Sequence, residues 1–318
     1  MIAFGPVPSR RLGRSMGINN IPPKICPYAC VYCQLERPST LRLERQVFYR
    51  PERILEEIRA KVEKARAGGE HIDYLTFVPD GEPTLDVNLG REIEMLSPLG
   101  IQTAVITNGS LLTDVEVRED LGKANWVSVK VDAASESVWR KVNRPHGKLD
   151  LDAIQKGTLA FASNYRGVLA TETMLVHGLN DGDDSLKRIA DRLGLIAPDV
   201  AYLAIPTRPP SVDWVRAPGE ERINRAYQII TERVDRVEYL IGYEGNAFAF
   251  TGDVEEDLLS ITAVHPMRED AVCEFLQRAD AAWDVVERLL QEDQLVRAEY
   301  GEHTFYLRRL NRHVDEES

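Results

Sequence analysis

Hydrophobic and polar positions between residues 15 and 234 alternate between two patterns. Short apolar runs rich in β-branched residues are followed by longer segments in which apolar residues recur at helical spacing. The short runs predict six strands, at Ser15–Ile21, Ile72–Val78, Gln102–Thr107, Trp126–Val131, Val168–Val176 and Val200–Ile205. The longer segments predict helices at Pro51–Ala67, Leu89–Leu96, Val115–Lys123, Asp152–Ser163, Ser185–Leu193 and Glu220–Val234. Repeated strand and helix units predict an α/β fold, and six units instead of eight predict a partial, open barrel.

The pattern changes after Phe250. Helical spacing predicts helices at Val254–Thr262, Glu269–Gln277 and Ala281–Gln291, followed by a hairpin of Leu295–Tyr300 and Thr304–Arg309 around Gly301-Glu302-His303. Three helices and a hairpin resemble a winged helix. We therefore expect residues 1–250 to form the barrel and residues 251–318 to form a small winged-helix-like domain, with a disordered acidic tail at 314–318.

Charge is unevenly distributed along this acidic chain, whose net charge is -12. Residues 251–318 contain 17 Asp and Glu against 7 Arg, whereas residues 1–50 contain eight Lys and Arg against two Glu. The basic segment favours anionic ligands near the N-terminus, and solvated surface charge is an equally open interpretation.

Three of the four cysteines fall within eight residues, at Cys26, Cys30 and Cys33. The loops that disulfides would close here are too small for a disulfide framework, so reduced thiolates that bind a metal are expected, in a cytoplasmic protein. The first residues do not resemble an export signal, and no stretch is long and apolar enough to span a membrane. No membrane partner is therefore expected.

The spacing Cys26-x3-Cys30-x2-Cys33 suits an iron-sulfur cluster. Three thiolates can ligate three irons of a [4Fe-4S] cubane and leave the fourth iron open for catalysis. A structural zinc site with one histidine is an alternative, but the nearest histidine in the sequence is His71. A second alternative is that the cysteines are buried thiols that bind no metal. Pro27 and Tyr28 argue against it, because they predict an exposed loop.

The fourth cysteine, Cys273, is expected on a helix as a small buried apolar residue.

The C-x3-C-x-aromatic-C motif, with Tyr32 before the third cysteine, resembles the hallmark of the radical S-adenosylmethionine (SAM) superfamily. The resemblance covers roughly residues 1–240 and implies a partial (β/α)6 barrel. It also implies a [4Fe-4S] cluster on Cys26, Cys30 and Cys33, with SAM bound at the open iron and cleaved to a 5'-deoxyadenosyl radical that abstracts hydrogen from substrate. A reductant protein such as flavodoxin or ferredoxin is then an expected partner.

Loops after the second and third predicted strands are similar to SAM-binding motifs of this superfamily. Asp80-Gly81-Glu82 resembles the Gly-Gly-Glu motif that holds the SAM amino group, with Asp80 in place of a glycine. Glu82 would supply the acceptor and Gly81 would permit close backbone approach, and a plain turn is the alternative. Thr107 and Asn108 are similar to residues that line the methionine end of SAM. Ser110 or Thr113 alternatively caps the following helix.

Polar residues on the fourth predicted strand share one face. Ser128, Lys130 and Asp132 alternate with valines, so they point into the barrel if the valines pack under the helices. In similar enzymes this face meets the ribose and carboxylate of SAM, and Tyr32 joins the implied cofactor-binding set. Loops that can reach substrate are Asn143-Arg144-Pro145-His146, His177-Gly178-Leu179-Asn180 and Pro206-Thr207-Arg208. In the N-terminal segment, Arg10, Arg11 and Arg14 can bind a carboxylate or phosphate, and pairing with surface acids is an equally open interpretation. No catalytic residue is assigned.

The motif set also resembles the branch labelled wyosine-base (tRNA) synthase-like iron-sulfur oxidoreductases. Members that act on tRNA add a second cysteine set, which this chain lacks. The substrate class therefore stays open between RNA, protein and a small anionic metabolite. An iron-sulfur redox sensor and a DNA-binding regulator are alternatives from other classes. Duplex DNA is not expected as a partner, because the helix near 279–292 has four acidic residues against Arg288.

Overall fold

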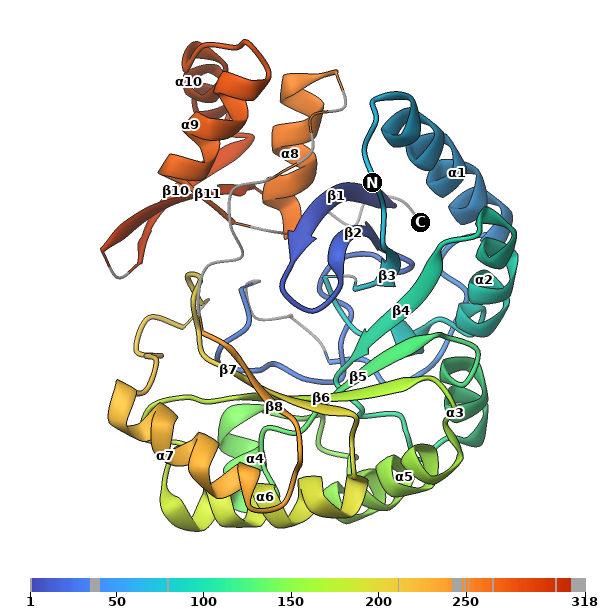
Figure 1. The fold of residues 1–318 in the computed structure, drawn as a ribbon, viewed down its shortest axis with the longest axis vertical. Coiled ribbons are helices and arrows are strands. Elements are labelled where there is room, and N and C mark those ends of the chain that lie inside the picture. The colour runs from blue at the N-terminus through green and yellow to red at the C-terminus, as the bar shows by residue number, and fades with distance from the viewer. Residues whose placement is uncertain are drawn as a thin grey trace.

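A curved sheet of eight strands forms the larger part of the molecule (Figure 1). The computed structural model describes residues 2–309 except 35–40, 79, 211, 242–247, 249, 251, 265 and 301. The strands follow one another in chain order: β1 (Ala3–Ser9), β2 (Gly13–Ile18), β3 (Tyr74–Phe77), β4 (Gln102–Thr107), β5 (Trp126–Lys130), β6 (Val168–Met174), β7 (Val200–Ala204) and β8 (Val237–Leu240). Within this sheet, β1 and β2 pair antiparallel, and every later pair is parallel.

The partial, open barrel predicted from the sequence is confirmed, since β1 and β8 are the two unpaired edges of the sheet. The six predicted strands correspond to β2–β7. The two edge strands were not predicted. Pro6 and Pro8 make β1 look unlike a strand, but proline is tolerated at an edge. β8 has only four residues, of which Glu238 and Tyr239 are not buried.

Helices cover the outer face of the sheet (Figure 1). They are α1 (Pro51–Ala67), α2 (Leu89–Leu96), α3 (Val115–Leu121), α4 (Glu136–Val142), α5 (Leu151–Asn164), α6 (Asp183–Ile196) and α7 (Glu220–Thr231). Alternate strand residues such as Leu75, Val105 and Leu203 pack against Ile58 and Leu193 of the helices in one buried cluster. This burial on both sides explains the near-continuous apolar strands.

The turn between β1 and β2 lies inside the barrel. Leu12 is buried there in a cluster with Trp126, Ala170 and Tyr202, which project from the inner face of the sheet. Trp126 begins β5, so this cluster fills the interior toward the amino ends of the strands. The space near the carboxyl ends, where barrel active sites form, stays available.

A separate C-terminal module (residues 254–309) has its own apolar core around Phe275, Val286 and Leu289. It consists of α8 (Val254–Val264), β9 (Met267–Arg268), α9 (Glu269–Arg278), α10 (Asp284–Gln291), β10 (Leu295–Tyr300) and β11 (His303–Arg308), with an antiparallel sheet in the order β10-β11-β9. The three predicted helices and the hairpin strands are present, and β9 is additional. Gly301 and the acidic tail lie outside the described residues. The winged-helix likeness and the domain boundary stay predictions.

The expectation that Cys273 is buried is wrong. It lies on α9, but its side chain is exposed. Ala271, Val272, Phe275 and Leu276 form the buried stripe of this helix, and Cys273 falls outside that stripe.

No helix in the described part of the chain is long and apolar enough to cross a membrane.

Candidate functional site

The cysteine loop follows β2 and is held against the segment after α4. Backbone amides of Ala29 and Val31 donate to the carbonyls of Asn143 and Val142 over 3.1 and 2.9 Å. The predicted exposure of Tyr28 is wrong, because Trp139 stacks edge-on against its ring at 5.9 Å and donates to its hydroxyl over 3.2 Å. The loop is therefore a packed part of the barrel.

Cys26, Cys30 and Cys33 all line one central cavity of about 690 Å³. Backbone N–H of Tyr28 and the Asn108 side-chain amide donate to Sγ of Cys26 over 3.4 and 3.3 Å. The Asn143 amide donates to Sγ of Cys30 over 3.5 Å. Burial and the neighbouring Asp132 raise the pKa of Cys30 to about 12, and burial and Cys30 raise that of Cys26. Such thiols need a metal to become thiolates.

The donor set fits a cubane better than a single metal ion. Each thiolate of a cubane ligates a different iron, so the three sulfurs do not converge on one point. Within the described residues, no three His, Cys, Asp or Glu side chains converge to hold one ion. No described histidine lines the central cavity, so the histidine that a Cys3His zinc site needs is not found among these residues.

The loop Asp80-Gly81-Glu82 pairs directly with the cysteine loop. Lys24 N–H donates to the Asp80 carbonyl over 2.6 Å, and Glu82 N–H donates to the Ile25 carbonyl over 2.9 Å. A Cβ on Gly81 would lie 2.3 Å from the Ile25 oxygen, so only glycine permits this approach. The predicted close backbone contact at Gly81 is thus with the cysteine loop itself.

The Glu82 carboxylate is buried and accepts several hydrogen bonds. Oε1 accepts from the Thr84 backbone, the Thr84 hydroxyl and the Thr107 hydroxyl over 3.2, 2.7 and 2.5 Å. Oε2 accepts from Asn108 N–H over 2.7 Å. Burial raises the pKa of Glu82, and these hydrogen bonds oppose the rise. Oε2 keeps a lone pair for a further donor, and Glu82 lines the central cavity.

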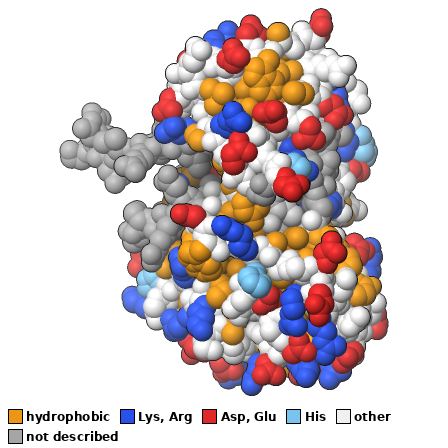
Figure 2. Space-filling model, turned by 90° about the vertical axis from the view of Figure 1, so that its left-hand side faces the viewer, with side chains coloured by type: hydrophobic (Ala, Val, Ile, Leu, Met, Phe, Trp, Pro, Cys, Tyr) orange, Lys and Arg blue, Asp and Glu red, His pale blue; other side chains and the backbone are white. Residues whose placement is uncertain are grey.

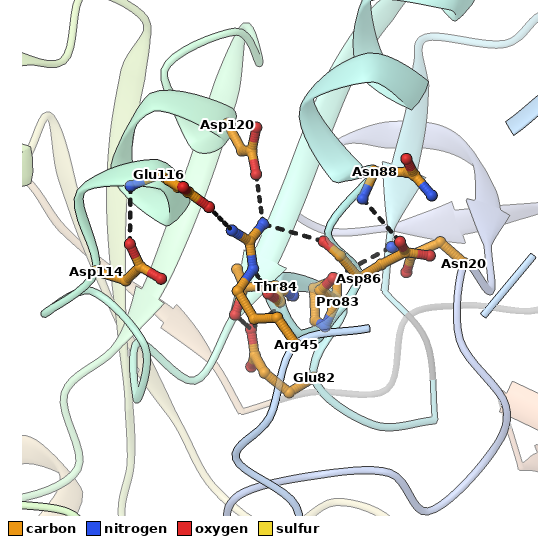
Figure 3. A network of polar contacts seen from close by, with 10 residues as sticks. All are labelled: Asn20, Arg45, Glu82, Pro83, Thr84, Asp86, Asn88, Asp114, Glu116 and Asp120. Carbon is orange, nitrogen blue, oxygen red and sulfur yellow. Dashed lines mark hydrogen bonds and ion pairs between the residues drawn. The ribbon is translucent and has the colours of Figure 1, made fainter. Parts of the chain in front are cut away.

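Arg45 fixes the loop that follows Glu82 (Figure 3). Its guanidinium donates to the carbonyls of Thr84 and Asp86 over 3.0 and 3.1 Å and to the Asp120 carboxylate over 2.5 Å. Glu116 is a more distant partner at 3.4 Å. Nothing in the sequence pattern indicated this residue, because the network joins segments up to 75 residues apart.

Thr107 ends β4 and Asn108 follows it directly, beside Glu82, and both line the cavity. The structure brings together the cysteine, Glu82 and Asn108 motifs that the sequence indicated separately. The alternative cap at Ser110 or Thr113 is wrong, because Asp114 caps α3 and accepts from Glu116 N–H over 2.9 Å. Their roles toward SAM stay predictions.

The three polar residues of β5 and its end have different surroundings. Lys130 lines the cavity and lies 5.2 Å from the centre of the Tyr32 ring. Asp132 accepts from the Tyr32 hydroxyl and, over 2.7 Å, from the Asn143 amide. Ser128 is buried, and its hydroxyl has no hydrogen-bond partner among the described residues. It does not line the cavity.

Glu172 of β6 is a cavity residue that sequence reasoning missed. It forms ion pairs with both Arg11 and Lys130. Burial would raise its pKa, but the two cations outweigh burial and lower the pKa to about 2. The alternation that identified Lys130 also applies to β6, where Glu172 stands between Ala170 and Met174 on the inner face. Arg11 thus pairs with a buried acid instead of a surface acid.

Asn143 and Asn180, from loops named as candidates for substrate contact, form hydrogen bonds within the site, and their contact with substrate stays a prediction. Asn143 joins Cys30 to Asp132, and Asn180 donates to the Asp132 carbonyl over 2.9 Å.

The fold and this site point to a class of enzymes, and comparison with known protein families identifies that class. The family model described as Radical SAM superfamily matches residues 20–192, and the chain belongs to this superfamily of enzymes. It is 44% identical over 311 residues to a UPF0026 protein of Methanocaldococcus jannaschii, covering 97% of this chain and 96% of that protein. A UPF0026 protein of Synechocystis sp. is 36% identical over 208 residues, covering 65% of this chain and 76% of that protein.

Solved structures share the fold at low sequence identity. The structure of TYW1 with a lysine-pyruvate adduct bound has a TM-score of 0.53 and 17% identity, and covers 70% of this chain and 74% of TYW1. A radical SAM methyltransferase from Sphaerobacter thermophilus has a TM-score of 0.51 and 18% identity, and covers 71% of this chain and 66% of that chain. These likenesses support the partial barrel and no particular substrate.

Proposed function

We propose that this radical SAM enzyme holds one [4Fe-4S] cluster on Cys26, Cys30 and Cys33 and binds SAM between the cluster and Glu82. The observation that carries the proposal is that the three cysteines, Glu82 and Asn108 all line one cavity. When bound, the cluster supplies the electron that cleaves SAM to methionine and a 5'-deoxyadenosyl radical, which abstracts hydrogen from substrate.

The residues of the chain bind and orient these groups. Asn108 and Asn143 direct N–H groups at two of the sulfurs, and N–H donors to cluster ligands tune the reduction potential. Glu82 offers Oε2 to the SAM amino group, while Thr107 and Thr84 hold its other oxygen. Tyr32 and Lys130 line the same cavity as Cys33. Water must be excluded from this cavity because the radical is reactive. A soluble one-electron donor such as flavodoxin or ferredoxin would supply the electron.

The test is SAM cleavage by protein reconstituted with iron and sulfide under anaerobic conditions and reduced with dithionite. We expect 5'-deoxyadenosine from the wild type and none from Cys26→Ala, Cys30→Ala or Cys33→Ala, because two thiolates are too few to hold the cubane. Cys273→Ala, on the exposed side of α9, is the matched control and should retain wild-type cleavage. Wild-type rates in any of the three loop variants would contradict the proposal.

A tRNA-modifying, wyosine-synthase-like activity is the second candidate. The resemblance of its motifs favours it, and the single cysteine set of this chain opposes it. A DNA-binding regulator has less support, because α10 exposes Asp284 and Glu287 and its Arg288 pairs with Glu255.

A further inference from the structure

The C-terminal module spans the open edge of the barrel. Helix α8 contacts β1 at one edge, where Lys61 donates to both the Ala3 carbonyl and the Ser260 hydroxyl over 3.3 Å. At the other side, Tyr300 of β10 donates to the carbonyl of Pro206, after β7, over 3.1 Å. Figure 1 places the module beside β1, above the loops at the carboxyl ends of the strands.

This module supplies part of the wall of the central cavity. Val296 and Ala298 of β10 and Leu307 of β11 line the cavity, together with Arg308 and Arg309. Val296 pairs with Leu307, so these apolar side chains share one face of the hairpin. The surface narrows between the module and the barrel, and hydrophobic side chains are exposed there (Figure 2). The cavity that contains the cysteines therefore extends beneath the module.

The cavity is cationic in an acidic protein. Seven of its described lining residues are Lys or Arg and three are Asp or Glu, whereas the whole chain has 39 Lys and Arg against 51 Asp and Glu. The contrast is sharper in residues 251–318, which contain 17 acidic residues and 7 arginines but give the described cavity wall two arginines and no acid. Charge of one sign focused in a cleft attracts ligands of the other sign.

Neighbouring acids leave part of this charge uncompensated. Lys130 and Arg11 share the single carboxylate of Glu172, and Arg309 pairs with Asp293 over 2.7 Å. Arg144 lies over the Trp214 ring, 5.9 Å from its centre. Among the described residues, neither Arg144 nor Arg308 has an ion pair with an acid. SAM adds net positive charge to the site, because its ammonium and sulfonium charges outnumber its single carboxylate.

We propose that the cavity binds a second ligand besides SAM, a small organic anion whose carboxylate or phosphate is held by Arg308 of the C-terminal module and Arg144 of the barrel. This inference rests on the proposed function and names the substrate class of the same site. A volume of about 690 Å³ lies in the range of small-molecule sites, and planar guanidinium groups suit carboxylates and phosphates. The hairpin makes the C-terminal module part of the substrate site.

The experiment measures anion binding by calorimetry in the full-length, cluster-reconstituted protein with SAM at saturation. Pyrophosphate and citrate are the probes, so that the two arms separate phosphate from carboxylate. We expect saturable binding of at least one probe, weakened about fivefold or more in Arg308→Gln and Arg144→Gln. The matched control is Arg297→Gln, because Arg297 lies on the same hairpin but is exposed and pairs with Glu299. Its affinity should stay at the wild-type value.

Four outcomes would overturn the inference. Neither probe binds saturably with or without SAM, or both arginine variants bind like the wild type, or a probe binds only when SAM is omitted, which would make these arginines ligands of SAM. Displacement by transfer RNA but not by nucleotides or organic acids would replace the small anion with RNA. SAM cleavage, assayed on the same samples, reports on the proposed function independently, since anion binding can persist without cleavage.

Discussion

The side-chain amide of Asn108 lies 3.3 Å from Sγ of Cys26, while its backbone N–H donates to Glu82 over 2.7 Å. One residue at the end of β4 thus contacts both the proposed cluster ligand and the proposed SAM ligand. We expect Asn108→Leu to keep the Glu82 contact, which uses the backbone, and to lose the N–H···S bond. The reduction potential of the cluster should then fall, because hydrogen bonds to the sulfurs stabilise the more negative reduced state.

The size of this effect follows from one hydrogen bond. A loss of about 1 kcal/mol corresponds to roughly 40 mV for a one-electron couple. Redox titration followed by electron paramagnetic resonance measures it. Asn164→Leu, on the exposed end of α5, is the control. An unchanged potential in Asn108→Leu would mean that this amide does not reach the bound cluster.

Glu82→Gln tests the SAM contact. The amide would still fill the buried space but lacks the charge that attracts an ammonium group. We expect a full iron content and a SAM dissociation constant raised about tenfold or more, equivalent to about 1.4 kcal/mol. Equilibrium dialysis with labelled SAM measures the constant. Wild-type affinity would show that the loop is only a turn.

Gly81→Ala should separate the two loops of the site. A Cβ 2.3 Å from the Ile25 oxygen forces the Glu82 loop away from the cysteine loop. We expect the free energy of unfolding to fall by about 1–3 kcal/mol and SAM affinity to fall with it. Urea denaturation and dialysis measure the two effects. Gly147→Ala, where a Cβ has open space, should change neither.

The pH dependence of stability should reveal the buried carboxyl of Glu92. Burial and repulsion by Asp86 raise the pKa of Glu92 to about 9, and burial raises that of Asp86 to about 6. The folded chain therefore keeps a proton on Glu92 that the unfolded chain releases, so this carboxyl costs stability as the pH rises toward 9.

Glu92→Gln should remove that cost. The variant should melt higher than the wild type above pH 8 and at a similar temperature near pH 5, with roughly 2–4 °C expected for each kcal/mol. Differential scanning calorimetry across this range measures the difference. Glu63→Gln, on the exposed side of α1, should follow the wild type. Parallel curves for Glu92→Gln and wild type would contradict the prediction.

Cluster stoichiometry separates this chain from enzymes with two clusters. Three of its four cysteines lie on one loop, and Cys273 is the fourth. Cys273 supplies one thiolate, which is too few to hold a second cubane. Reconstituted protein should contain about four irons per chain, and Cys273→Ala should leave the iron content and the cluster spectrum unchanged. An iron content near twice that value that depends on Cys273 would contradict the assignment of a single cluster.

Local patterns in the sequence determined much of this protein. Apolar periodicity predicted strands β2–β7 and every barrel helix except α4, because a strand buried on both faces and a helix with one buried face have different spacings of apolar residues. The sequence also indicated the three cysteines by their spacing and Glu82 and Asn108 by their resemblance to short motifs, and the structure places all five at one cavity. Lys130 was found because an inward polar residue interrupts an apolar alternation.

Only the tertiary structure decided which distant groups meet. Arg11 and Glu172 are 161 residues apart, and Arg45 and Asp120 are 75 apart, so no local pattern records either pair. The edge strand β1 lacks a local signal for the same reason, because pairing with β2 and packing against α8 stabilise it despite its prolines. Arg308 lines the cavity because the C-terminal module, which has its own apolar core, packs against the barrel. Side-chain burial and charge pairing between separate segments are properties of that packing, which the order of residues along the chain does not display.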